Sequence, residues 1–281
     1  MKKLLLLLLM GGVMVACKKD SLDPNDPNNP NNQPDPLEVS RVQNMFAINF
    51  SGTWCGPCGS SGIPAITAAH TQYGNKLHIM KVGFSDEFTI QGLNHELAQS
   101  YYPSSSIGIP GFGAGEQFLQ GASAWRSAID AMAGKADASA KAALAITQQV
   151  KGDSLLVKVR MKSFEALSNA VYSWTVFIIE DDLVAPQAGL QPNPYNHKFV
   201  YRGNAIIPGQ VPLGVWGHSV TGNPTASAIP ANTEYNASFA FVKPVMSPAV
   251  DLSKCYAYVV LNRLNTSFRP AEYINSASTR K

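Results

Sequence analysis

The sequence predicts an α/β domain followed by an all-β sandwich domain, both placed behind an export signal and a tether. Between residues 38 and 135, apolar runs of strand length alternate with helical patterns, which is typical of an α/β layer. From residue 138 to residue 281, strand-like runs follow one another without helical patterns between them, which is typical of a β-sandwich. The 281 residues are enough for two domains of ordinary size.

Residues 1–17 have the pattern of a bacterial export signal. Lys2 and Lys3 precede the apolar run 4–10, which is too short to remain as a membrane-spanning helix. Residues 14–17, Met-Val-Ala-Cys, resemble a lipobox, and this resemblance implies that Cys17 becomes the lipidated first residue of the mature chain. The alternative is an ordinary secretory signal with an incidental cysteine. On the first interpretation, the acyl chains on Cys17 anchor the protein to a membrane.

Residues 18–37 are expected to form a disordered tether. Asn and Pro dominate this stretch, and it offers almost no apolar side chains to bury. It would hold the folded part of the chain away from the membrane surface. The formal net charge of +3 is too small to indicate nucleic acid as a partner.

The most informative residues form a Cys-x-x-Cys run between a predicted strand, 44–50, and a predicted helix, 55–73. The run consists of Trp54, Cys55, Gly56, Pro57 and Cys58. Two intervening residues bring the sulfurs within disulfide reach at the first helical turn, where free N–H groups stabilise a thiolate. We therefore expect Cys55 to be the nucleophile and Cys58 to resolve the mixed disulfide. Pro57 suits a helix start because its missing N–H is not needed there.

The rest of the first domain is predicted from apolar patterns. The expected elements are a strand at 76–84, a helix at 91–100, a strand at 116–119 and a helix at 123–132. The glycine-rich stretch 111–115 is expected to be a mobile loop. Gly59 and Gly62, with the serines between them and Pro64 after them, predict a poorly helical first turn and a kink.

With Ile109-Pro110 about fifty residues downstream, the Trp-Cys-Gly-Pro-Cys run resembles the thioredoxin superfamily. The resemblance covers residues 38–135. It implies a cis Pro110 opposite the cysteines, where the backbone of an extended substrate peptide would pair. One position departs from the family pattern, because Asn49 stands where thioredoxins usually have a buried Asp that accepts the proton of the resolving thiol.

The cysteine pattern does not favour a metal site or a covalently attached haem. Zinc would need four ligands, and no second close cysteine pair or Cys/His cluster is present. Haem attachment would need His after the second cysteine, where Gly59 stands. We therefore expect no metal and no other cofactor. A purely structural disulfide between Cys55 and Cys58 remains the alternative to a redox-active dithiol.

The second half is predicted to be an antiparallel sandwich of immunoglobulin-like type. Its expected strands are 143–150, 155–162, 172–179, 234–243 and 255–264. The long irregular segment 181–230 interrupts them, and a loop of that length is usually functional or packs as a substructure. Cys255 lies in an apolar strand and is expected to be a buried free thiol.

The segment 176–181, followed by 195–197 and Arg202, resembles the outer membrane lipoprotein family named for its 28-kilodalton member. That family joins a thioredoxin-like domain to a β-sandwich. The resemblance implies an outer-membrane location in the cell envelope and a surface or adhesive role. His197 and Arg202 are candidate binding residues, and the alternative is that they fix the long loop by hydrogen bonds.

Taken together, these patterns predict a membrane-anchored thiol–disulfide oxidoreductase. Its partners would be cysteine-containing exported proteins and an electron donor or acceptor that the sequence does not identify. The alternative is a surface binding or adhesion lipoprotein in which the thioredoxin-like fold is a scaffold.

Overall fold

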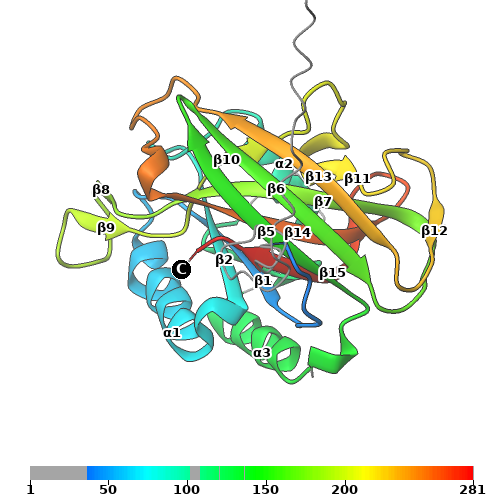
Figure 1. Cartoon of the computed structure of the whole chain (residues 1–281). Coiled ribbons are helices and arrows are strands. Elements are labelled where there is room, and N and C mark those ends of the chain that lie inside the picture. Colours follow the sequence, from blue (N-terminus) through cyan, green and yellow to red (C-terminus); the bar gives the residue numbers. More distant parts are fainter. Residues whose placement is uncertain (1–36, 102–107, 120, 136, 281) are drawn as a thin grey trace, which may run out of the picture. The chain divides into compact units, whose positions relative to one another are not determined.

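The apolar strand expected at 44–50 lies inside a ten-stranded mixed sheet (Figure 1). The computed structural model describes residues 37–101, 108–119, 121–135 and 137–280. The expected export signal, the lipidation of Cys17 and all of the expected tether except Leu37 lie outside the described residues. The strand order is β15-β14-β7-β10-β2-β1-β3-β4, and β11 and β12 also pair with β7.

Four of these strands and three helices surround the redox motif. The strands are β1 (Met45–Ser51), β2 (Leu77–Gly83), β3 (Gly111–Ala114) and β4 (Gln117–Leu119). The helices are α1 (Ile63–Tyr73), α2 (Leu93–Tyr101) and α3 (Ala122–Ala133). β1 pairs parallel with β2 and antiparallel with β3, and β3 pairs antiparallel with β4. The alternation β1-α1-β2-α2 and the final pair β4-α3 match the expected pattern, whereas β3, which forms a hairpin with β4, was not expected as a strand.

The glycine-rich stretch expected to be a mobile loop is instead the buried strand β3. Large side chains fix its backbone by hydrogen bonds. The Trp125 indole donates to the carbonyl oxygen of Gly113 at 3.0 Å, and the Tyr101 hydroxyl donates to that of Gly115 at 2.8 Å. The glycines therefore make room for aromatic rings to reach the main chain, and the prediction of mobility was wrong.

The large sheet continues without a break into the second half of the chain. β10 (Val200–Ala205) pairs parallel with β2 at Val200 and Lys81. Beyond it lie β7 (Leu167–Glu180), β14 (Cys255–Leu264) and β15 (Pro270–Ser278). The ranges 38–135 and 138–281 thus share one sheet, and a separate immunoglobulin-like sandwich is not confirmed. The division into two domains stays a prediction.

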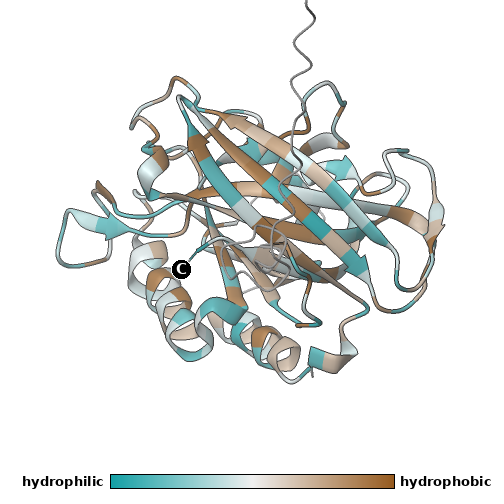
Figure 2. Ribbon diagram, viewed as in Figure 1, coloured by the Kyte–Doolittle hydropathy of each residue, from teal (hydrophilic) through white to brown (hydrophobic). Residues whose placement is uncertain are grey.

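A second, three-stranded sheet packs against the β7 and β14 part of the large one. Its order is β13 (Glu234–Val242), β6 (Ser154–Ser163), β5 (Ala142–Lys151). Val157 and Phe239 from this sheet and Trp174 and Val259 from the large sheet belong to one buried cluster. The alternation of apolar and polar residues along β6 is visible in Figure 2, and it follows from one face being buried.

Besides β10, the long irregular region 181–230 contains four short strands. They are β8 (Leu183–Ala185), β9 (Tyr195–His197), β11 (His218–Ser219) and β12 (Ser227–Ile229). β8 and β9 form an antiparallel hairpin of their own. Single 3₁₀ turns lie at Gly74–Lys76, Asp137–Ser139, Gly214–Trp216 and Leu252–Lys254. Of these strands, β8 and β9 are the ones closest to the candidate site, because the tip of their hairpin contacts the turn that carries Cys55.

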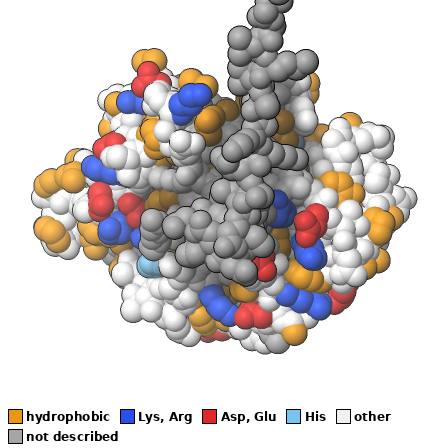
Figure 3. All heavy atoms as spheres, in the orientation of Figure 1, with side chains coloured by type: hydrophobic (Ala, Val, Ile, Leu, Met, Phe, Trp, Pro, Cys, Tyr) orange, Lys and Arg blue, Asp and Glu red, His pale blue; other side chains and the backbone are white. Residues whose placement is uncertain are grey.

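On the face drawn in Figure 3, basic and acidic side chains lie interspersed. Two of the ion pairs are Lys76 with Asp137, at 3.1 Å, and Arg126 with Asp130, at 3.0 Å. Within the described ranges, no helix has the length and apolar character needed to cross a membrane.

Candidate active site

Cys55 and Cys58 form a disulfide at the point where β1 gives way to the helical segment. A π-helical turn, Cys58–Gly62, precedes α1, so the first turn departs from regular α-helix as its glycines and serines predict. The backbone N–H of Cys58 points at Cys55 Sγ over 3.1 Å. A thiolate on Cys55 would therefore have a donor already aimed at it. Cys58 is fully buried and Cys55 is only 5% exposed.

The turn before the disulfide is held by an acidic loop. The backbone N–H of Thr53 donates to Asp86 Oδ2 at 3.0 Å, and its hydroxyl donates to Glu87 at 2.9 Å. Burial raises the pKa of Asp86, while hydrogen bonds from backbone N–H groups, including that of Thr53, lower it. Trp54 is 58% exposed, and its indole N–H donates to the carbonyl oxygen of Phe84 at 2.9 Å. An aromatic surface thus stands beside the disulfide.

Pro110 and Asn49 lie next to the first helical turn. The Ile109-Pro110 peptide bond is cis, which is the isomer the family resemblance implied. A Cβ atom built on Gly62 would be 3.6 Å from Pro110 Cβ and 3.9 Å from Asn49 Nδ2. Asn49 is fully buried and donates to the carbonyl oxygen of Gly111 at 3.2 Å, and its Oδ1 has no partner among the described residues.

The tip of the β8–β9 hairpin covers the disulfide turn. We call residues 187–189 the cover segment. The Gln187 side chain is buried, and its Nε2 lies 3.3 Å from the carbonyl oxygens of both Gly52 and Cys55. The backbone N–H of Ala188 donates to the carbonyl oxygen of Thr53 at 2.8 Å. The segment therefore binds the carbonyl groups of the turn that carries the nearly buried Cys55.

Two glycines allow this close approach. A Cβ atom on Gly59 would lie 2.1 Å from the carbonyl oxygen of Ala188, and one on Gly189 would lie 2.1 Å from that of Gly56. Gly189 also has a φ of +76°, which favours glycine. The cover segment was not predicted. Its only signal in the sequence is the pair of glycines, which by themselves do not indicate that the two segments meet.

His197, a candidate binding residue, is fully buried on β9. Its Nδ1 lies 2.5 Å from the Nζ atom of Lys81, which is 3% exposed on β2. Burial lowers the pKa of Lys81 to about 7. Burial, followed by the charge of Lys81, lowers the pKa of His197 to about 3. The contact ties the hairpin to the sheet, and this network was missed because Lys81 gave no sequence signal.

Arg202, the second candidate binding residue, lies in a different network. It is fully buried and forms an ion pair with Glu180 at 3.1 Å, and it donates to the carbonyl oxygen of Pro248. The structure does not bring His197 and Arg202 together, and neither side chain is exposed. Cys255 is a buried free thiol, and burial raises its pKa to about 12. Among the described residues, no cluster of His, Cys, Asp and Glu could hold a metal ion.

The fold resembles that of solved structures at low sequence identity. HBP35 of Porphyromonas gingivalis, which has a thioredoxin-like domain, matches with a TM-score of 0.62 and 16% identity, over 86% of this chain and 76% of that one. This likeness shows the fold. A protein from Agrobacterium tumefaciens matches with a TM-score of 0.48 and 12% identity, over 86% of this chain and 94% of that one.

A domain of the outer membrane lipoprotein Omp28 from Porphyromonas gingivalis matches with a TM-score of 0.30 and 16% identity. This match covers 50% of this chain and 87% of that one. No family model and no curated protein matches the sequence.

Proposed function

We propose that this chain is a thiol–disulfide exchange protein in which Cys55 attacks and Cys58 resolves. The observation that carries the proposal is the Cys55–Cys58 disulfide at a helix start, with the N–H of Cys58 aimed at Cys55 Sγ over 3.1 Å. A donor in that position lowers the energy of the Cys55 thiolate relative to the thiol. The adjacent exposed Trp54 and the cis Pro110 support a site for an extended peptide substrate.

The exchange balances without a cofactor. In the reduced protein, the Cys55 thiolate attacks a substrate disulfide, so that one S–S bond forms, one breaks, and the leaving thiolate takes a proton. Cys58 then loses its proton and attacks Cys55 Sγ, which releases the reduced substrate and restores the intramolecular disulfide. Asn49 cannot accept the proton of Cys58, so water or another base takes it. A thiol reductant must then reduce the disulfide for the next turnover.

The cover segment must move for this chemistry to occur. A substrate sulfur has to approach Cys55 Sγ in line with the bond that breaks, and Cys55 is almost inaccessible beneath Gln187 and Ala188. The described state is therefore the oxidised and closed form. Opening of the β8–β9 hairpin tip would precede exchange.

We place this activity in the cell envelope. Residues 1–17 resemble a lipoprotein export signal ending at Cys17, and residues 18–37 have the composition of a tether. Membership of the outer membrane lipoprotein family is part of the same proposal and rests on the residue pattern around 176–202. The substrates would then be exported proteins with cysteines.

A second candidate function is a surface binding lipoprotein with a structural disulfide. The closed state favours it, because a disulfide under a hydrogen-bonded cover is protected from exchange. His197 and Arg202 are buried, so a binding surface would have to use other residues. Trp54 and Val184 are exposed near the hairpin and are available for such contacts.

Trapping of mixed disulfides tests the two candidates. The Cys58→Ser protein keeps the nucleophilic thiol of Cys55 but lacks the resolving thiol. Covalent adducts with envelope proteins should therefore accumulate, and they should disappear on reduction. Cys255→Ser is the matched control, because it removes a buried thiol away from the site and should leave trapping unchanged. The purified wild type should also accelerate insulin reduction by dithiothreitol. Absence of both adducts and insulin reduction would leave the binding lipoprotein as the better explanation.

A further inference from the structure

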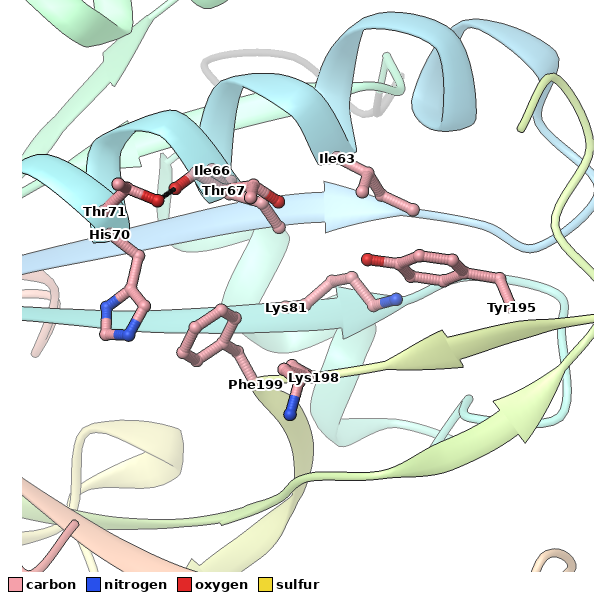
Figure 4. Close-up of a pocket in the computed structure, with 9 residues that line it drawn as sticks. All are labelled: Ile63, Ile66, Thr67, His70, Thr71, Lys81, Tyr195, Lys198 and Phe199. Carbon is pink, nitrogen blue, oxygen red and sulfur yellow. Dashed lines mark hydrogen bonds between the residues drawn. The ribbon is translucent and has the colours of Figure 1, made fainter. Parts of the chain in front are cut away.

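A cavity of about 180 Å³ lies between helix α1, strand β2 and the segment 195–199, which runs from β9 to the start of β10 (Figure 4). Its inner wall is formed by the buried side chains of Ile63, Ile66 and Phe199, with Lys81 beside them. Thr67, Thr71 and Lys198 are exposed at its rim, so the cavity opens to solvent. Tyr195 and His70 complete the lining. This volume holds several water molecules or one small organic molecule.

The cavity contains a buried ammonium group that lacks a carboxylate partner. Lys81 is 3% exposed, and its Nζ contacts His197 Nδ1, a neutral acceptor when the imidazole is uncharged. Among the described residues no ion pair joins Lys81 to an acidic side chain, and the carboxylates of Asp86 and Glu87 act on its charge only from a greater distance. Buried charges in proteins are normally paired, because an uncompensated charge is costly to bury. An anion from outside the chain would supply the close negative charge that Lys81 lacks and would favour its charged form.

Tyr195 is placed to bind the same anion as Lys81. Figure 4 shows the Tyr195 hydroxyl and the Lys81 nitrogen directed toward the same space. Lys198 adds positive charge at the rim, although it already pairs with Asp182 at 3.0 Å. His70 accepts from Arg280 through Nε2, and its buried Nδ1 has no partner among the described residues. Lys81 and Tyr195 thus place an amino group and a hydroxyl at one end of the cavity, and His70 lies toward the other end.

We propose that this cavity binds a small organic carboxylate, whose carboxylate group contacts Lys81 and Tyr195 and whose alkyl chain packs on Ile63, Ile66 and Phe199. An inorganic anion would leave those three apolar side chains against water. An uncharged apolar molecule would leave Lys81 without a counter-ion. A molecule with a carboxylate at one end and a short alkyl chain satisfies both parts of the lining. The proposal does not depend on the exchange activity of Cys55 and Cys58.

Titration with hexanoate tests this proposal, with hexan-1-ol as the uncharged probe of the same chain length. The purified protein should bind hexanoate with a submillimolar dissociation constant, measured by calorimetry, and hexan-1-ol at least about tenfold more weakly. In NMR spectra, the Cε–Hε signals of Lys81 should shift on addition of hexanoate, and its pKa should rise, since a carboxylate favours the charged form. Equal binding of the two probes, or no hexanoate binding in the millimolar range, overturns the proposal.

Two variants test whether hexanoate binds in this cavity. Lys81→Met keeps the length of the side chain and removes the charge, so it should weaken hexanoate binding at least about tenfold without weakening hexan-1-ol binding. Lys76→Met is the matched control, because Lys76 is exposed and pairs with Asp137 outside the cavity. If Lys81→Met does not fold, Tyr195→Phe should still weaken hexanoate binding severalfold. Unchanged affinity in a folded Lys81→Met protein, or complete displacement of hexanoate by equimolar phosphate, overturns the assignment.

Discussion

At the scale of single residues, buried Lys81 should make the stability of the protein depend on pH above about 7. Its pKa falls from 10.5 in an exposed chain to about 7 in the fold, because burial disfavours the charged form. Between these values the unfolded chain binds more protons than the folded one, so the free energy of unfolding should rise with pH in that window. Lys81→Met should remove this rise and stabilise the protein at about pH 7. Urea unfolding at about pH 7 and about pH 9 measures the change in the free energy of unfolding, and Lys76→Met serves as the control.

A second prediction at this scale concerns Asn49, whose amide donates to the carbonyl oxygen of Gly111. Asn49→Asp replaces that donor by a carboxylate in a fully buried position, so its folded pKa should lie above the unfolded one. The free energy of unfolding should decrease by about 1–3 kcal/mol at about pH 7. This decrease should become smaller as the pH falls, because the carboxyl group becomes protonated. Urea unfolding at two pH values checks this. Asn49→Leu, which cannot ionise, should show no such pH dependence, and parallel behaviour of the two variants would contradict the argument.

The roles expected for Cys55, Cys58 and Pro57 follow from three-residue spacing, so the sequence was sufficient to place them together. Lys81 and His197 are 116 residues apart, and their contact depends on β9 reaching β2. No local pattern indicates that meeting. The candidate binding roles of His197 and Arg202 were inferred from residue type. In the fold both side chains are buried, and His197 contacts Lys81 whereas Arg202 pairs with Glu180.

At the scale of elements, we expect the cover segment to limit access to the disulfide, because it packs on the turn that carries Cys55. Gly59→Ala should displace it, because the new Cβ would lie 2.1 Å from the carbonyl oxygen of Ala188. We expect faster reduction of the Cys55–Cys58 disulfide by dithiothreitol and a loss of about 1–3 kcal/mol in stability. Gly56→Ala is a matched control, because a Cβ there has no neighbour within 4 Å. Equal reduction rates in the two variants would show that the segment does not limit access.

Elements with strong periodicity were predictable, and those held by distant contacts were not. The strand expected at 255–264 coincides with β14, because its apolar run is long enough to identify. β8 and β9 have three residues each, too few for a period-2 pattern. β15 was missed because it carries polar residues that are buried, such as Asn275, whose Nδ2 donates to the carbonyl oxygens of Val42 and Ala142. Such burial depends on a partner segment that the local sequence does not reveal.

At the scale of the folded unit, the redox half depends on strands from the other half. The Phe46 ring on β1 stacks on Phe177 of β7 with centroids 5.7 Å apart. His78 on β2 contacts the Ser276 hydroxyl at 2.8 Å and stacks on Tyr258. These aromatic and hydrogen-bonding contacts lie in the core and not on a domain surface. Removal of the second half would therefore expose a large part of the core around β1 and β2.

This dependence predicts that residues 37–135 do not fold alone. The fragment would keep the whole Cys-x-x-Cys motif and the β1–β2 pair but lose β10, which pairs with the other edge of β2, and aromatic side chains that pack on β1, such as Phe177. It should show poor amide dispersion in NMR spectra and no cooperative thermal transition, whereas residues 37–280 should unfold in a single transition. A cooperative transition in the fragment would instead establish 38–135 and 138–281 as independent folding units. In that case the shared sheet would be an interface between two domains, and thiol–disulfide exchange could be assayed in the first domain alone.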